Sequence, residues 1–304
     1  MNFELQQPSH IVSLATSAVL VSVDVNVWSA TKQDRVISDE ITKQKKADQS
    51  AGRFVKNLLA DDQFHKQVSN YRQTIYNWLQ RATFRWNNSQ NILPVVSLEK
   101  FKTEFNAHEV EFNRLLDNFI NNYQIIVGNM AFKQGDMFNK DDYPDASEVR
   151  NKFGIKLYVS EVPSHDWRCQ ISQDIASDLK LQYERQAEGI VQNIVSEQAE
   201  RITEVLESIS HCCGVQEIKD AITGEVRTKK RKIYESTIDK AKEMCRTFKQ
   251  FKPIKNSISD KLEDAINKLE QTLNGVDSEL IRDSDAVRNK VQSEVNDILE
   301  KFKM

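Results

Sequence analysis

The segment VQNIVSEQAERITEVLESISHCC, residues 191–213, decides the fold that the sequence predicts. Its apolar residues repeat at heptad spacing in two rows, and Gln198 is the polar member of the second row. Alternating steps of four and three residues align such rows along one side of a helix, where they suit a helical partner. The first row contains Val195, Ile202 and Ile209, and the second contains Val191, Val205 and Cys212.

This segment belongs to a long helical hairpin that we expect between about Ile171 and Phe251. Its first arm, from Arg168 to Cys213, would extend roughly 65–70 Å at 1.5 Å per residue. The return arm is expected at residues 229–252, because Pro253 cannot continue a helix. Two further helices are predicted, one at residues 258–273 and one starting at Asp277 or Ser278.

The apolar seams of these helices could close within one chain or between chains, and the sequence leaves both alternatives open. In the second case they would make the protein a homo-oligomer. The candidate seam residues are Val191, Val195, Ile202, Val205, Ile209, Leu262, Ile266, Leu269 and Leu273.

The N-terminal half is predicted to be rich in helices, with a small β element. Alternating β-branched residues indicate strands at about residues 18–27 and 153–162, and we expect these two strands to pair with each other. Helices are predicted over residues 34–60, where the helix can break near Ser50–Gly52, from Asp61 to about Ala82, and from Leu98 to about Phe132, the last with Ser97 as its N-cap. The run from Asn87 to Pro94 is expected to be a loop.

The fold class predicted from these patterns is mainly α, in two consecutive parts. Residues 1–165 would form an α-rich domain with a two-stranded β element. Residues 166–304 would form an elongated antiparallel helical region, resembling a coiled coil. Only eight glycines and five prolines occur in 304 residues, which agrees with long uninterrupted helices.

Composition also bears on location and on ligands. The net charge of −3 gives no general attraction to nucleic acid or to anionic lipid, so either ligand would need a local patch. Residues 1–10 lack the Lys and Arg of a secretory leader, and polar residues interrupt the apolar run Ile11–Val27. Four cysteines without disulfide-framework spacing suit a reducing compartment. We therefore expect a cytoplasmic protein that makes no membrane contact.

Motifs for chemistry are missing from the sequence. No phosphate-binding glycine loop, nucleophile elbow or zinc-protease motif occurs. His165 with Cys169, and the run from His211 to Cys213, lack the paired short spacings of a zinc site. The acidic loop at residues 136–145 lacks the residue order of a calcium loop. We expect no catalytic residue, no metal and no cofactor.

Two basic clusters are candidates for binding nucleic acid. The first, Arg227, Lys229, Lys230, Arg231 and Lys232, is expected at the tip of the hairpin, in the first turn of the return helix. Cations there oppose the helix dipole, which favours a role in gripping phosphates.

The second cluster places Arg81 and Arg85 on one helix face, near Tyr76 and Trp86, which could stack on bases. The core periodicity of the neighbouring aromatic residues favours a structural role for this second cluster.

Several short strings in the first half of the chain form a recognisable set. They are VDVNVW at 23–28, YRQT at 71–74, RWNNS at 85–89, GDMF at 135–138 and VSEVP at 159–163, followed by RCQ at 168–170. Together they resemble a phage- and plasmid-borne family, a domain of unknown function whose genes often lie near MoxR- or cobalt-chelatase-like AAA+ ATPases. The similarity covers roughly Val19 to Gln170. It implies a mobile-element origin, a bacterial host cytoplasm and a partner role beside such an ATPase, and it assigns no catalytic residue.

These observations favour a non-enzymatic assembly protein, a helical scaffold or adaptor to a larger machine such as an AAA+ ATPase. The alternative is a protein that binds nucleic acid through the basic cluster at the hairpin tip. A pore-forming helical toxin comes third, because its one candidate for insertion, Ile11–Val27, carries Asp24 and Asn26.

Overall fold

The computed structural model describes residues 14–163, 173–219, 226–252 and 258–303. They form two compact units, each assembled from separated parts of the chain. Unit 1 comprises the described residues up to Val21, Arg81–Leu98 and those from Val159 onward, and unit 2 comprises Ser22–Gln80 and Glu99–Tyr158. These units are not the two consecutive segments, 1–165 and 166–304, that the sequence predicted.

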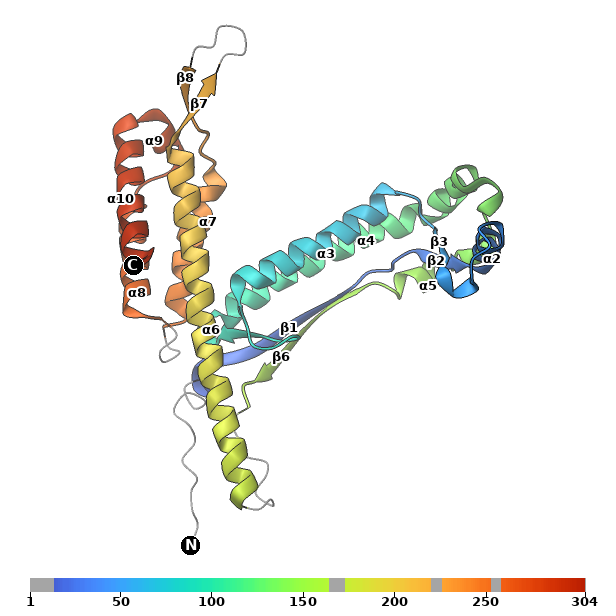
Figure 1. The fold of residues 1–304 in the computed structure, drawn as a ribbon, viewed down its shortest axis with the longest axis horizontal. Helices are drawn as coiled ribbons and strands as arrows, with labels where there is room; N and C mark the ends of the chain where they lie inside the picture. Colours follow the sequence, from blue (N-terminus) through green and yellow to red (C-terminus); the bar gives the residue numbers. More distant parts are fainter. Residues whose placement is uncertain (1–13, 164–172, 220–225, 253–257, 304) are drawn as a thin grey trace. The chain divides into compact units, whose positions relative to one another are not determined.

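Unit 1 is a bundle of helices around the long helix α6 (Gln173–Cys213). Helix α6 packs mainly against α10 and α7, and α8 packs against both of those helices (Figure 1). The predicted start of the first arm at Arg168 lies outside the described residues. Because α6 contacts several helices, the unit is a bundle and not the elongated two-helix hairpin we expected. The other helices are α7 (Glu235–Gln250), α8 (Asp260–Thr272), α9 (Ser278–Asp283) and α10 (Asp285–Lys303).

Local signals explain the starts of α8 and α9 and the turn between these two helices. The side chain of Ser259 accepts a hydrogen bond from the Leu262 amide at the start of α8, and Asp277 accepts one from the Leu280 amide at the start of α9. Gly275, with φ of 68°, permits the turn between these helices. The predicted helices at 258–273 and from 277 are confirmed, except that Ser284 divides the second into α9 and α10.

A four-stranded sheet has the strand order β4-β5-β1-β6. The pairing that we predicted between the Val19 strand and the Ile155 strand is confirmed, because β1 and β6 are neighbours. The predicted loop from Asn87 to Pro94 is corrected, because its end forms β5, antiparallel to β1 with Ile92 opposite Leu20. The strands are β1 (Ala18–Asn26), β4 (Phe84–Arg85), β5 (Asn91–Pro94) and β6 (Gly154–Glu161).

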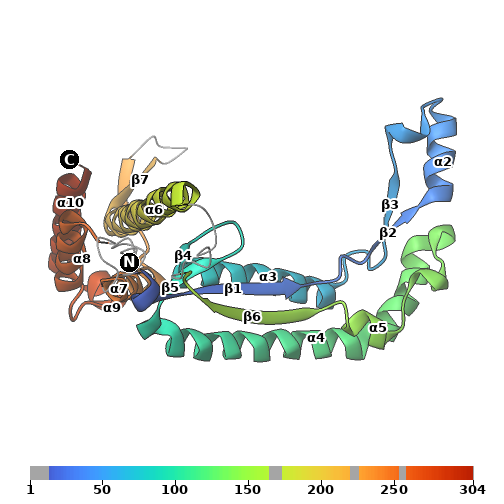
Figure 2. The same ribbon diagram turned by 90° about the horizontal axis from the view of Figure 1, so that it is seen from below.

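Unit 2 has its core between helices α3 (Gln63–Ala82) and α4 (Leu98–Gln134) and the adjoining parts of β1 and β6 (Figure 2). Its core is aromatic: Phe112, Phe119 and Tyr123 of α4 are almost fully buried. The predicted central helix from Leu98 is therefore confirmed. Ser97 is not its N-cap. It is the last residue of a short 3-10 turn, Val95–Ser97, and its hydroxyl donates to Oε1 of Gln250 at 2.7 Å.

The remaining elements of unit 2 surround a buried ion pair. The predicted helix at 34–60 is only partly right, because it covers α2 (Arg35–Gln44) but also part of a strand. In the chain, α2 connects β2 (Thr31–Asp34) to β3 (Phe54–Asn57), and these two strands pair antiparallel. Lys56 is 4% exposed, forms an ion pair with Asp142 and donates to the Met137 carbonyl at 2.7 Å. Helix α5 (Ala146–Arg150) completes the unit. The Lys56–Asp142 ion pair and the hydrogen bond to Met137 therefore connect β3 to the segment after α4.

None of the described helices is both long enough and apolar enough to cross a lipid bilayer.

Candidate interaction surfaces

The predicted seam residues lie in the core of unit 1 and do not form an outer face. Val195 and Val205 are half-buried, and the other seven are at most 5% exposed. This corrects the use of these residues as a surface between chains, because their apolar area is already covered by helices of the same chain. The buried seven are Val191, Ile202, Ile209, Leu262, Ile266, Leu269 and Leu273.

Gln198 is the polar exception within this core. Its side chain is fully buried, and both its amide nitrogen and its amide oxygen have no hydrogen-bond partner. A buried amide without partners lowers stability, since water has been removed from it without replacement. The heptad pattern places Gln198 in a row of apolar residues, but only the structure shows that this row lies inside the bundle.

The first basic cluster lies on a β-hairpin and not at a helix start. Strands β7 (Val215–Lys219) and β8 (Val226–Lys230) pair antiparallel directly after α6 (Figure 1). Helix α7 begins only at Glu235, so the predicted return helix from Lys229 is corrected, and with it the argument from the helix dipole. The cluster nevertheless lies beyond the end of the first arm, as expected.

A buried arginine holds the base of this hairpin. Arg288, in the first turns of α10, is 3% exposed. Its Nε donates to the Cys213 carbonyl at 2.8 Å, and its Nη2 donates to the carbonyls of Cys212 and Arg231, each at 2.7 Å. These carbonyls belong to the end of α6 and to the chain leaving β8. One guanidinium therefore joins both ends of the hairpin and caps the negative end of the α6 dipole.

The second basic cluster is divided between elements. Arg81 lies at the end of α3, whereas Arg85 lies in β4, so the two do not share one helix face as predicted. The carbonyl of Arg81 accepts a hydrogen bond from Arg201 of α6, and Trp86 packs against the core of unit 1. Arg201 is twelve residues from the end of α6, which is roughly 18 Å along the helix. The structure does not bring the two basic clusters together.

The aromatic residues beside the second cluster have a structural role in unit 2. Trp78 is buried, stacks on Phe101 at 4.6 Å between ring centroids and donates from Nε1 to Glu104 at 2.7 Å. Tyr71 is bonded through its hydroxyl to Nδ1 of His108 at 2.8 Å. The guanidinium of Arg72 lies 5.5 Å from the ring centroid of Tyr76. This agrees with the core periodicity seen in the sequence.

The cysteines and histidines are not assembled into a centre in the part of the chain that the structure describes. No group of three or more His, Cys, Asp or Glu residues there could hold a metal ion. Burial raises the pKa of Cys213 to about 11 and that of Cys245 to about 12. At neutral pH both thiols therefore stay protonated and poorly nucleophilic. His165 and Cys169 lie outside the described residues.

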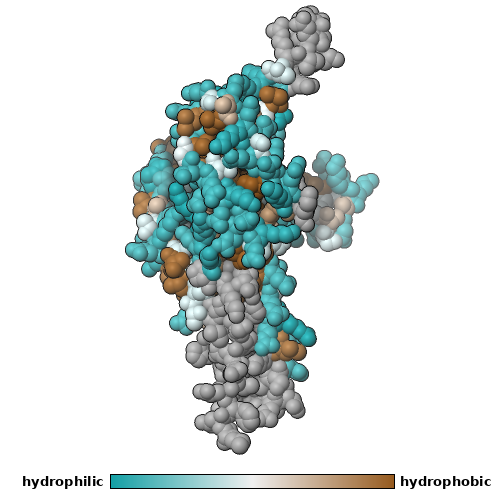
Figure 3. Space-filling view, turned by 90° about the vertical axis from the view of Figure 1, so that its left-hand side faces the viewer, coloured by the Kyte–Doolittle hydropathy of each residue, from teal (hydrophilic) through white to brown (hydrophobic). Residues whose placement is uncertain are grey.

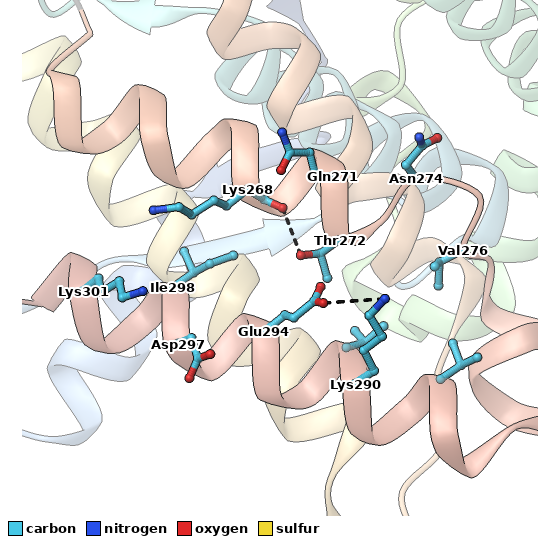
Figure 4. Close-up of a pocket in the computed structure, with 12 residues that line it drawn as sticks. Lys268, Gln271, Thr272, Asn274, Val276, Lys290, Glu294, Asp297, Ile298 and Lys301 are labelled. Carbon is cyan, nitrogen blue, oxygen red and sulfur yellow. Dashed lines mark hydrogen bonds and ion pairs between the residues drawn. The ribbon is translucent and has the colours of Figure 1, made fainter.

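A groove of about 440 Å³ runs between α8 and α10 (Figure 4). Its floor includes Val291 and Ile298, and its rim carries charges of both signs, among them Lys290 and Glu294 at 3.8 Å. Figure 3 shows this side of unit 1 as mostly hydrophilic, with separate hydrophobic patches. A shallow groove with mixed, partly paired charges has no arrangement of nucleophile and base to assign.

The surface that the sequence reading missed is the outer face of α4. Asn121, Ile125, Gly128 and Phe132 recur at steps of four, three and four residues, and all four are exposed. Ile125 is 65% exposed and Phe132 is 91% exposed, although both are large apolar residues. In Figure 2, α4 runs along the edge of unit 2, with β6 on one side and no described element of the unit on the other. We name this surface the outer α4 face.

The outer α4 face also lacks charge. Residues 118–132 contain no Asp, Glu, Lys, Arg or His. The charges before this stretch are paired, since Asp117 contacts Arg150 at 2.5 Å and Arg114 contacts Glu111 at 2.7 Å. An exposed helix face usually carries charged residues, so this face has the pattern of a contact surface. The second heptad seam on α4 is the signal in the sequence that could have revealed it.

Comparison of the chain with protein-family models, with curated proteins and with solved structures gave no match.

Proposed function

We propose that this protein is a non-enzymatic assembly protein, a helical scaffold whose copies associate through the outer α4 face. The observation that carries the proposal is Phe132, an aromatic side chain that is 91% exposed at the C-terminal end of the outer α4 face. Covering apolar area of this kind is the main favourable term in protein association.

A second copy suits this face because the face is neutral. In a two-fold symmetric contact the residues next to the axis meet their own copies, so an unpaired charge near the axis would face a like charge and be repelled. Residues 118–132 carry no charge that could do so. An antiparallel pair centred between Gly128 and Asn129 would set Ile125 of one copy against Phe132 of the other, twice.

Gly128 supports close approach at this centre. A Cβ added at Gly128 would meet no atom within 4 Å, so the space above the residue is open. A side chain of a second helix could occupy that space. One helix face is a small interface, and small interfaces associate weakly, so we expect a dimer that depends on protein concentration.

The decisive experiment is multi-angle light scattering or sedimentation over protein concentrations from about 5 to 500 µM, a range that detects weak dimers. The Phe132→Asp variant should remain monomeric, because each of the two carboxylates would be buried unpaired against Ile125 of the other copy. A matched control, Val110→Asp, alters another exposed apolar residue of α4, outside the proposed contact, and should leave the association intact.

Cross-linking tests the antiparallel arrangement separately. In the Gly128→Cys variant the new thiols would meet near the two-fold axis and should form a disulfide dimer under mild oxidation. Wild-type protein is the background for the native cysteines, and Val110→Cys should add no dimer beyond it. A wild-type protein that stays monomeric at every concentration would refute the proposal.

The resemblance of residues 19–170 to a family encoded near AAA+ ATPases supports such an ATPase as the partner of this scaffold. We propose an adaptor role towards it, in addition to self-association. Co-expression with a MoxR-like AAA+ ATPase, followed by size-exclusion chromatography, should show the two proteins eluting together. Separate elution, with no change in the rate of ATP hydrolysis, would count against the adaptor role.

A further inference from the structure

The proposed self-association does not use the cations in β8 and directly after it. Lys229 and Lys230 lie in β8, and Arg231 and Lys232 follow directly. The side chains of Lys229 and Lys232 are exposed, and within the described chain neither forms a hydrogen bond or an ion pair. Lys230 is paired with Asp285, and Arg231 donates weakly to the His211 carbonyl at 3.4 Å.

Across the hairpin, the two lysines of β8 are directly opposite uncharged residues of β7. Lys229 is opposite Gln216 and Lys230 is opposite Val215, while Glu217 is opposite Thr228. Residues directly opposite each other in an antiparallel pair lie on the same face of the ribbon. The lysines of β8 therefore have no acidic neighbour directly across the hairpin.

The base of the hairpin adds a further positive charge. Arg288 is buried, and its partners are backbone carbonyls of residues 212, 213, 214 and 231. Carbonyl oxygens carry only partial negative charge, and no carboxylate neutralises this guanidinium among its hydrogen-bond partners in the described chain. Its hydrogen bonds to both ends of the hairpin also hold the ribbon in a fixed position on the bundle. A positioned cationic ribbon has a smaller entropic cost of binding than a flexible tail.

We propose that the β7–β8 hairpin binds the phosphate backbone of double-stranded DNA. A two-stranded antiparallel ribbon fits the major groove of B-DNA, whereas the major groove of duplex RNA is too narrow. Neither β7 nor β8 contains an aromatic residue, so stacking on the bases of a single strand has no platform in these strands. Lysines contacting phosphates give affinity without sequence preference.

The test is fluorescence anisotropy of a labelled DNA duplex and of its single strand, titrated with the full-length protein across a salt series. If four cations contact phosphates, the association constant should fall about a hundredfold between 50 and 200 mM salt. The variant Lys229→Glu with Lys232→Glu should show no measurable binding at 200 mM salt. Lys229→Gln with Lys232→Gln should bind more weakly than wild type and lose only about tenfold over the same range, because two contacts are missing.

A matched control separates this site from the net charge of the protein. Lys240→Glu with Lys261→Glu changes two exposed lysines of α7 and α8, and takes the net charge from −3 to −7, as the hairpin variant does. This control should bind like wild type, and thermal unfolding should be equal in both variants. Binding lost equally in both variants, tighter binding of the single strand, or no binding of wild type at about 50 mM salt would each overturn the proposal. None of these results bears on self-association, which the light-scattering experiment measures.

Discussion

Replacing Gln198 by leucine is predicted to stabilise unit 1. Gln198 is fully buried among the apolar residues of α6, with its amide nitrogen and oxygen both unpartnered. Leucine has a similar volume, so it should fit the same space without leaving a large cavity or forcing the helices apart. The substitution therefore removes an unfavourable term while most of the packing is kept.

The magnitude follows from the cost of an unmade hydrogen bond. Leaving a buried polar group unsatisfied costs about 1–3 kcal/mol, and burying apolar atoms in place of the amide adds a further favourable contribution. We expect the free energy of unfolding to increase by about 2 kcal/mol. For a unit of this size, that increase corresponds to a rise of about 4–8 °C in the midpoint of thermal unfolding.

Differential scanning calorimetry and urea unfolding followed by circular dichroism measure this change. The control is Gln192→Leu, the same substitution on the exposed side of α6, which should change stability by no more than about 0.5 kcal/mol. A Gln198→Leu protein that unfolds at or below the wild-type temperature would refute the reasoning. That result would mean that the amide is stabilised in the native bundle.

Three further predictions concern the cores and the buried charges. Phe112→Ala should lower the free energy of unfolding of unit 2 by about 3–5 kcal/mol in urea, because Phe112 is fully buried, and a loss below 1 kcal/mol would contradict its place in the core. Burial raises the pKa of Asp142, but hydrogen bonds from Lys32 and Lys56 outweigh it and lower the pKa overall. The stabilisation is therefore present above the unfolded pKa of about 4 and is lost as pH falls through the lower folded value. Asp142→Asn should weaken amide-exchange protection of β3 at pH 7, and the difference from wild type should shrink below about pH 3; equal protection of both proteins at pH 7 would exclude the ion pair as the cause. Cys245, whose pKa is raised by burial to about 12, should resist a maleimide reagent in native protein and react in urea, as mapped by mass spectrometry; rapid labelling of native protein would show that the site opens.

The sequence alone predicted those helices and strands whose own residues show a clear periodic pattern. The alternation from Val19 to Val27 predicted β1, and the aromatic spacing from Phe101 to Ile126 predicted α4 and its buried side. These patterns are local and repeat several times. Gln198 was recognised as a break in a heptad row, although its burial depends on helices more than forty residues away.

The rest depended on partners that the local sequence does not specify. Strand β5 has only four residues, and its buried Ile92 and Leu93 lack alternation, so the surrounding Asn and Pro residues favoured a loop. The run of cations after Arg227 gave no strand signal, because lysine has low β propensity. It becomes β8 through pairing with β7. The outer α4 face was overlooked because the larger residues of the opposite face dominate the same helix.

The division of the chain between the two units sets an order for events during synthesis. All of unit 2 has left the ribosome once Tyr158 has emerged, so its core can close at that point. The segment from Arg81 to Leu98, together with the start of β1, must wait, because its apolar residues Phe84 and Ile92 pack in a core completed by α6 to α10. Until about 140 more residues have been translated, those side chains remain uncovered, and this interval is when the nascent chain is most exposed to aggregation and most dependent on chaperones.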